Sequence, residues 1–261
     1  MYLNIFKKKK RIIFKLVFSD GYFCVSRNFK LQKVGNVKWL FDKLKFANIS
    51  KYIDELVIVN ASPSNFQNPI SSEFRSSVIK LMEKTFVPLT VGGGLSNISQ
   101  VQECFKIGAD KIILNSAIKD NKKLFKDCVI KFGSQAVIMG IDFKKTGTKF
   151  FSYINNGQNK FLEIEKHLNI ANKLKCGEIF LGSIDRDGTG FGFEKNVIKA
   201  FKLNIPLVLS GGAGKPNHFE DVIFDKKLSG LMTGNLFNFL GNGLNKLREN
   251  LQKKSVNLRI I

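Results

Sequence analysis

Eight short apolar segments recur along this 261-residue chain, each followed by a longer amphipathic stretch. They are RIIFKLVF from Arg11, ELVIVN from Glu55, PLTVGG from Pro88, KIILN from Lys111, AVIMGID from Ala136, EIFLGS from Glu178, PLVLSG from Pro206 and SGLMTGN from Ser229. The stretches between them include the helical patterns SEFRSSVIKLMEKTF and ISQVQECFKIG. Apolar strands alternating with helices predict an α/β fold, a closed parallel (β/α)8 TIM barrel. An open doubly wound sheet is the alternative, and eight similar units favour the barrel.

The two halves of the chain resemble each other. PLTVGGGLSN in the first half matches PLVLSGGAGK in the second, and DELVIVNAS matches GEIFLGSID. This repetition predicts two similar half-barrels with paired sites. Because no linker or low-complexity stretch interrupts the pattern, we expect one domain over residues 1–261, with residues 1–10 as a basic N-terminal extension.

A formal net charge of +21 would ordinarily suggest nucleic acid or an anionic membrane as a partner. The lysines, however, are spread through helix-like segments rich in Phe, Ile and Asn, a composition that an AT-rich genome produces by itself. We therefore expect no nucleic-acid and no membrane partner. Steering of phosphorylated or acidic substrates remains compatible with the charge.

Targeting signals and cysteine pairs are not evident. No run approaches the roughly 18 apolar residues of a membrane span, and MYLNIFKKKK lacks the apolar segment of a signal peptide. Four scattered cysteines without a C-x-x-C pair indicate buried, reduced thiols: Cys24, Cys104, Cys128 and Cys176. A cytoplasmic location is expected.

Two glycine clusters follow the third and seventh predicted strands: Gly92, Gly93 and Gly94 after the third, and Gly211, Gly212 and Gly214 after the seventh. In a barrel of this kind the active site lies at the C-terminal ends of the strands. Glycine lets backbone N–H groups approach an anion closely. The clusters therefore suit a substrate with a phosphate at each end, although tight turns alone are the simpler explanation of each cluster.

Carboxylates occur at the same end of the barrel. Asp142 ends the fifth strand, where burial of a charge is costly, and is a candidate general acid or base. Asp185 and Asp187 follow the sixth strand in DRDGTG, where a hydrogen-bonded turn and a substrate-binding role for Asp185 are both open. With only His167 and His218 available, we expect no histidine triad, metal site or cofactor.

Four strands begin with a charged residue: Arg11, Glu55, Lys111 and Glu178. Strand starts converge on the axis at the bottom of a barrel, so two cations and two anions could form a closed ion-pair ring there. Such a ring would be a polar plug or a gate. Independent, solvated charges are the alternative.

These residues together resemble the HisF family, the cyclase subunit of imidazole glycerol phosphate synthase, from Arg11 to Phe239. The matching motifs are DELVIVNAS, TVGGGL, GADKIILNSA, FGSQAVIMGID, GEIFLGSIDRDGTGFGFE and SGGAGKPNHF. The resemblance implies a (β/α)8 synthase of the lyase or cyclase type, paired with a HisH-like glutaminase at its N-terminal (bottom) face. Ammonia would pass through the barrel to a bis-phosphorylated substrate, giving imidazole glycerol phosphate and an aminoimidazole carboxamide ribotide.

The resemblance also assigns residues. It makes Arg11, Glu55, Lys111 and Glu178 the ammonia gate, and Asp142 one of two catalytic aspartates. The substrate- and phosphate-binding positions would be Gly93, Asn115, Asp185, Gly188, Thr189, Gly212, Gly234 and Asn235.

Three departures accompany these matches. Val17 stands where the family's CLDV-like sequence has the other catalytic aspartate, Asn60 replaces an expected aspartate, and Asn235 replaces a serine. Asp20 lies in a DG context that the family shares, which argues against a shifted carboxylate. Loss of one acid–base group should cost about 10²- to 10⁴-fold in rate.

A complete gate below a weakened cyclase resembles the HisF-like paralogues associated with surface-polysaccharide genes, including those for lipopolysaccharide. The resemblance implies a glutaminase, a third, amidating ligase protein and a sugar acceptor. We favour this glutamine amidotransferase role. The ordinary cyclase of histidine biosynthesis and a non-catalytic, glutaminase-activating scaffold are the alternatives.

Overall fold

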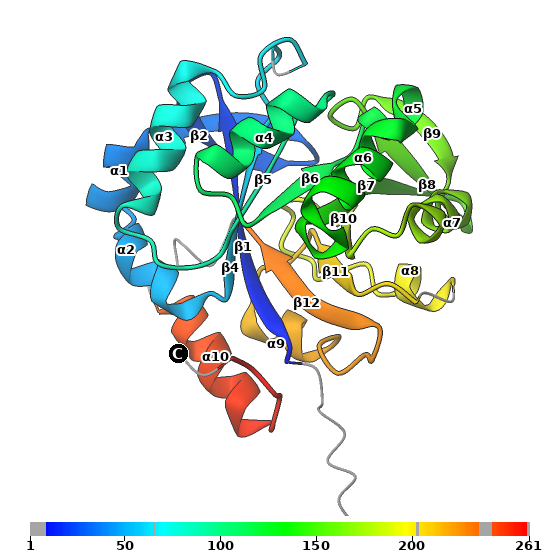
Figure 1. Cartoon of the computed structure of the whole chain (residues 1–261). Helices are drawn as coiled ribbons and strands as arrows, with labels where there is room; N and C mark the ends of the chain where they lie inside the picture. The colour runs from blue at the N-terminus through cyan, green and yellow to red at the C-terminus, as the bar shows by residue number, and fades with distance from the viewer. Residues whose placement is uncertain (1–8, 65, 202–203, 235–241, 260–261) are drawn as a thin grey trace, which may run out of the picture.

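Eight parallel strands form a closed ring in the computed structural model, which describes residues 9–64, 66–201, 204–234 and 242–259 (Figure 1). Around the ring they are β1 (Arg11–Ser19), β4 (Glu55–Asn60), β5 (Leu89–Gly92), β6 (Lys111–Leu114), β7 (Val137–Thr146), β10 (Glu178–Ser183), β11 (Leu207–Ser210) and β12 (Leu228–Thr233). Pairing of β12 with β1 and of β7 with β10 completes the circle. The predicted (β/α)8 barrel is confirmed, and all eight predicted strands are present.

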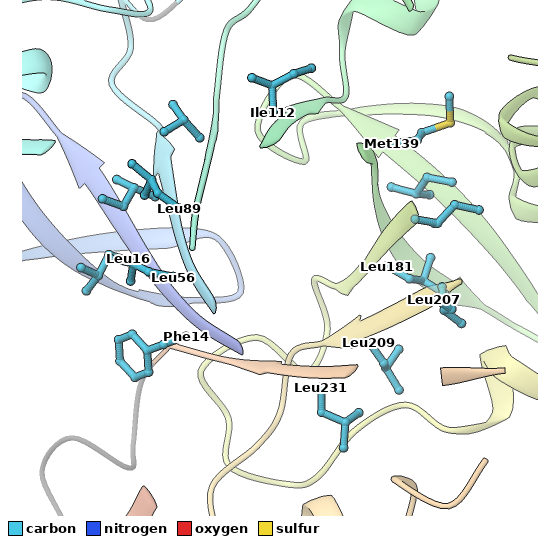
Figure 2. Close-up of a cluster of buried hydrophobic side chains, with 14 of the residues drawn as sticks. Phe14, Leu16, Leu56, Leu89, Ile112, Met139, Leu181, Leu207, Leu209 and Leu231 are labelled. Carbon is cyan, nitrogen blue, oxygen red and sulfur yellow. The ribbon is translucent and has the colours of Figure 1, made fainter. Parts of the chain in front are cut away.

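Each barrel strand is apolar on both faces because it separates two cores. The outer core, between strands and helices, includes Phe14, Leu56 and Leu231, which project outward from the ring in Figure 2. The neighbouring residues along each strand point the other way, and some of them, such as Ile13 and Val57, form a separate cluster inside the barrel. This double burial explains why the sequence showed continuous apolar runs rather than alternation.

The helices surround the ring. They are α1 (Val37–Asp42), α2 (Phe46–Ile49), α3 (Ser72–Met82), α4 (Ile98–Lys106), α5 (Ala117–Asp120), α6 (Lys122–Phe132), α7 (Ile164–Leu174), α8 (Asn196–Lys199), α9 (Pro216–Glu220) and α10 (Gly243–Lys253), with 3₁₀ turns η1 (Ser50–Tyr52) and η2 (Ser134–Ala136). The two helical patterns quoted above become α3 and α4, whose N-caps Ser71 and Asn97 accept backbone N–H groups. None of the described helices is long and apolar enough to cross a membrane.

Two β-hairpins extend the barrel, and the sequence did not reveal them. β2 (Tyr22–Arg27) and β3 (Lys30–Gly35) follow β1, whereas β8 (Lys149–Ile154) and β9 (Asn159–Glu163) follow β7. Both parent strands run past the barrel and pair antiparallel with the first strand of their hairpin. The hairpins stand at the first strand of each half-barrel, in agreement with the predicted repeat.

A buried ion pair fixes α10 at the bottom of the barrel. Arg248 Nη2 lies 3.0 Å from Asp54 Oδ1, and both side chains are almost fully buried. Asp54 Oδ2 also accepts the Ile12 backbone N–H at 2.8 Å. Since Asp54 directly precedes β4, this contact couples the last helix to the first two barrel strands. All four cysteines are buried and unpaired, as predicted.

Candidate active site and ion-pair ring

The structure brings the four charged strand starts together inside the bottom of the barrel. Arg11 Nη1 lies 2.5 Å from Glu55 Oε2, and its Nη2 bonds to Glu178. On the other side, Lys111 Nζ lies 2.9 Å from Glu55 Oε2 and 3.8 Å from Glu178 Oε2. Each carboxylate therefore contacts both cations, and the four residues close a ring, which we call the ion-pair ring.

Neighbouring hydroxyl groups complete the ion-pair ring. Thr90 Oγ1 donates to Glu55 Oε1 at 2.6 Å, and Ser229 Oγ lies 2.6 Å from Glu178 Oε1. Although burial by itself lowers the pKa of the Arg11 guanidinium, the carboxylates of Glu178 and Glu55 outweigh it and raise the net pKa. The charges are thus mutually satisfied, which a buried ionic group requires.

An apolar layer lies directly above the ion-pair ring. Each ring residue is followed, two positions later on its strand, by an inward apolar residue: Ile13, Val57, Ile113 and Phe180. Ile138, Val208 and Met232 belong to the same interior cluster. A charged group that crossed this layer would lose its hydration, at a large cost in free energy. The desolvation of a small neutral molecule costs much less.

A cavity of about 480 Å³ opens above the apolar layer at the C-terminal ends of the strands. Val57, Ile113 and Phe180 contribute to its lining, together with Asp142 and Asn115. The same interior residues therefore border the ion-pair ring on one side and the cavity on the other.

Asp142, at the end of the barrel part of β7, is the acidic group of this cavity that sequence reasoning identified. Its Oδ2 accepts a hydrogen bond from Asn115 Nδ2 at 2.7 Å. Burial raises the pKa of its carboxyl to about 6; the Lys15 ammonium and the Asn115 hydrogen bond oppose this rise, and Asp187 adds to it. A carboxyl that titrates near neutral pH is suited to proton transfer.

Val17 lines the same cavity from the opposite wall. Its side chain is nearly buried, and β1 and β7 stand four places apart in the ring of eight. Val17 pairs with Cys24 of the first hairpin, just as Asp142 pairs with Tyr153 of the second. The two residues occupy equivalent positions in the two halves, and only one of them carries a carboxylate.

Predicted glycines line the cavity walls. Gly93 borders the large cavity, and Gly188, Gly212 and Gly234 border an adjoining pocket of about 30 Å³. A Cβ atom on Gly93 would lie 2.0 Å from the Asn60 carbonyl oxygen, and Gly93 has φ +102°. The loops thus come close to one another with backbone exposed to the cavity, as an anion site requires.

Two predicted site residues lie elsewhere. Asp185 is exposed, and its Oδ2 accepts the Lys145 backbone N–H at 2.8 Å, so its side chain stabilises a loop. Thr189 Oγ1 donates to the Arg186 carbonyl oxygen at 2.8 Å within the same turn. Neither residue lines the cavity or the adjoining pocket. Asn235 lies outside the described residues.

The other substitutions have local structural partners. Asn60 Nδ2 donates to the Pro69 carbonyl oxygen at 2.9 Å, a bond that a carboxylate could not make. Its Oδ1 accepts from Ser62. Asp20 is half-exposed in the turn after β1, 3.8 Å from Lys33, and it does not line the cavity.

Besides Asp142, three charged residues among those that the structure describes line the cavity: Lys15, Asp120 and Asp187. Sequence reasoning did not identify Lys15 or Asp120, and it named Asp187 without giving it a role. Lys15 Nζ lies 3.8 Å from Asp187 Oδ1. The signal for Lys15 was present, because Arg11, Ile13, Lys15 and Val17 alternate along one face of β1. For Asp187, the sequence offered two aspartates two positions apart, Asp185 and Asp187, and no means of choosing between them.

Neither histidine lines the cavity or the adjoining pocket. His167 is fully buried on α7 against the Phe161 ring, and burial lowers its pKa to about 4. His218 Nδ1 accepts the Gly214 N–H at 3.1 Å. Within the described part of the chain, His, Cys, Asp and Glu side chains do not gather in threes as a metal site would need.

Comparison with known proteins agrees with this geometry. The family described as "Histidine biosynthesis protein" matches residues 46–242. The "Putative imidazole glycerol phosphate synthase subunit hisF2" of Parasynechococcus marenigrum is 36% identical over 250 residues, 95% of this chain and 92% of that protein. The "Imidazole glycerol phosphate synthase subunit HisF" of Chlorobium chlorochromatii is 33% identical over 96% of this chain and 98% of its own length. This chain therefore belongs to the HisF family.

Proposed function

We propose that this chain is the synthase subunit of a glutamine amidotransferase complex and that its ammonia acceptor is a sugar of a surface polysaccharide. In this proposal, ammonia enters through the ion-pair ring and reacts in the upper cavity. The observation that carries the proposal is the combination of a complete ion-pair ring with Val17 at the position equivalent to Asp142.

The interior of the barrel supports the ammonia path. The ion-pair ring is followed by apolar side chains and then by Asp142 and Asn115. Asn115 Oδ1 is buried, and it accepts no hydrogen bond from any residue that the structure describes. This oxygen could accept a hydrogen bond from ammonia or from an amide N–H of the acceptor, which would remove the cost of its burial.

The bottom rim offers a surface for the proposed HisH-like glutaminase. Phe86, in the loop before β5, is 90% exposed, and Phe224, in the loop before β12, is 56% exposed. Loops that precede barrel strands lie on the same side as the ion-pair ring. Exposed aromatic side chains are typical of protein interfaces, so we assign docking to this rim. A third, ligase-type protein would activate the acceptor.

Val17 supports an acceptor other than the histidine-pathway substrate, because only Asp142 of the two equivalent positions can transfer a proton. The four buried, unpaired thiols agree with a cytoplasmic complex.

Turnover of the bis-phosphorylated cyclase substrate with excess ammonium tests the proposal. We would compare the native protein with Val17→Asp. The proposal expects native turnover about 10²- to 10⁴-fold below that of an ordinary cyclase and a gain of activity in the variant. An ordinary native rate would overturn it.

Val59→Asp is the matched control. Val59 pairs with Val17 across β1 and β4 and also lines the cavity, so this variant adds the same charge on the wrong strand. It should not gain cyclase activity. A gain in both variants would mean that any additional carboxylate suffices.

The cyclase of histidine biosynthesis is the second candidate. The Asp142–Asn115 hydrogen bond and the glycine loops in both halves favour it, as do the names of the related proteins. Rescue of a histidine auxotroph that lacks its own cyclase would support this candidate over the first.

A further inference from the structure

Lys15 is a charged residue inside the barrel for which the proposed ammonia path has no role. It lies on β1 between the inward residues Ile13 and Val17 and pairs with Val57 of β4. Its side chain is 19% exposed and lines both the large cavity and the adjoining pocket. An ammonium group at this depth needs a negative partner.

The contacts of Lys15 are loose. Its Nζ lies 3.8 Å from Asp187 Oδ1 and 5.9 Å from the centre of the Phe29 ring. The first distance is within ion-pair range but beyond hydrogen-bond distance. Lys15 Nζ donates no hydrogen bond to any residue in the described ranges.

Asp187 is fixed by other groups. Its Oδ2 bonds to Ser26 Oγ and accepts the Phe29 backbone N–H at 3.2 Å. Lys15 is therefore not needed to hold Asp187 in place. The ammonium extends from β1 to Asp187, which follows β10, and β10 pairs with β7, the strand that carries Asp142.

We propose that Lys15 is a positioning residue of the upper cavity: its ammonium balances the carboxylates of Asp142 and Asp187 and keeps Asp142 ionised, ready to accept a proton. The role as a base rests on the proposed function, whereas the charge balance does not. Two carboxylates that share a cavity without a cation between them would favour the protonated form of one of them.

Other groups around Asp142 do not replace this charge. Asn115 is neutral, Tyr153 faces Asp142 across the β7–β8 ladder, and Asp120 adds a further negative charge to the cavity lining. Lys144, two residues along β7, lies over the Tyr153 ring. Lys15 is the cation whose charge lowers the pKa of Asp142.

Carbon-13 NMR titration of protein labelled at the aspartate carboxyl carbons tests the proposal without any substrate. The Asp142 signal is the one missing from Asp142→Asn, and its native midpoint should lie near pH 6. Lys15→Met should raise that midpoint by about one pH unit or more. Lys15→Arg, which keeps the charge, should leave it within a few tenths of a pH unit.

Asp187→Asn is the opposing variant. Because Asp187 repels the ionised form of Asp142, its neutralisation should lower the midpoint, and the Lys15→Met/Asp187→Asn double variant should fall between the single variants. An unchanged midpoint in Lys15→Met, with the other aspartate signals preserved, would overturn the proposal. The Asp142 midpoint can stay unchanged in Lys15→Met even if the native protein shows ammonia-dependent activity. The role of Lys15 and the proposed function can therefore fail separately.

Discussion

The first and second half-barrels place different side chains at equivalent positions. β1 and β7 each extend into a hairpin, and Val17 of one half corresponds to Asp142 of the other. The loop glycines also correspond, because Gly93 approaches the Asn60 carbonyl oxygen as Gly211 approaches that of Ser183. The backbone therefore shows the repeat, whereas of these two equivalent positions only that of the second half carries a carboxylate.

The difference shows which features of the repeat are structural. Close backbone approach constrains Gly93 and Gly211 in both halves, since any side chain there would collide with the neighbouring loop. Position 17 has no such constraint: valine packs at the cavity wall, and a carboxylate would need solvation or a partner. The fold therefore tolerates different side chains at position 17, whereas it requires glycine at positions 93 and 211.

The largest expected effect concerns Asp142 itself. In the Val17→Asp background, Asp142→Asn should reduce the gained cyclase turnover about 10²- to 10⁴-fold, because one carboxylate cannot serve as both acid and base. Steady-state turnover with ammonium measures this effect. Full retention of the gained activity would show that the first half can act alone.

A structural asymmetry gives the next effect. Asp54, before β4, pairs with Arg248, whereas the equivalent position before β10 is Gly177. Arg248→Met should lower the free energy of unfolding by about 3–5 kcal/mol, because it leaves a buried charge unpaired. Equilibrium unfolding in denaturant measures this change in the free energy of unfolding. Lys254→Met, which breaks the more exposed pair with Glu220, is the control and should cost less than about 1 kcal/mol.

The raised pKa of Asp142 predicts a smaller, pH-dependent effect. Because the folded-state pKa is about 6 and the reference value is 3.8, the fold loses stability as the pH rises from about 4 to about 6, and the full cost of ionising Asp142 is present above pH 6. Asp142→Asn should therefore stabilise the protein by roughly 1–3 kcal/mol at pH 7. The gain should disappear as the pH falls below about 4.

Unfolding at several pH values checks this prediction, with Val17→Asn as the comparison from the other half. That variant removes no charge, so its effect on stability should not change between pH 4 and pH 7. If Asp142→Asn differed from the native protein by the same free energy of unfolding at pH 4 and at pH 7, the pKa of about 6 for Asp142 would be contradicted.

The smallest effect is expected at Asp20, the acidic residue nearest to Val17 in the chain. It is half-exposed, and its contact with Lys33 is 3.8 Å long. Asp20→Asn should change the free energy of unfolding by less than about 0.5 kcal/mol. It should also leave the turnover of the bis-phosphorylated cyclase substrate unchanged. A large loss of activity would mean that Asp20 takes the role of the missing carboxylate.

The sequence by itself determined the barrel, because eight apolar strands that are buried on both faces have few other ways to cover their edges. It also identified the four members of the ion-pair ring, since strand starts of a closed barrel must meet near the axis. Asp142 was recognisable because a carboxylate at the end of an apolar strand is costly without a purpose.

Only the tertiary structure decided which charges share the upper cavity. Asp185 and Asp187 are two residues apart, and the turn directs the first to Lys145 and the second toward Lys15. Lys15 reaches this region from the opposite side of the barrel, a relation between residues more than 100 positions apart. Local sequence constrains strand and turn, whereas the proton state of Asp142 depends on burial and on charges that meet only when the ring closes.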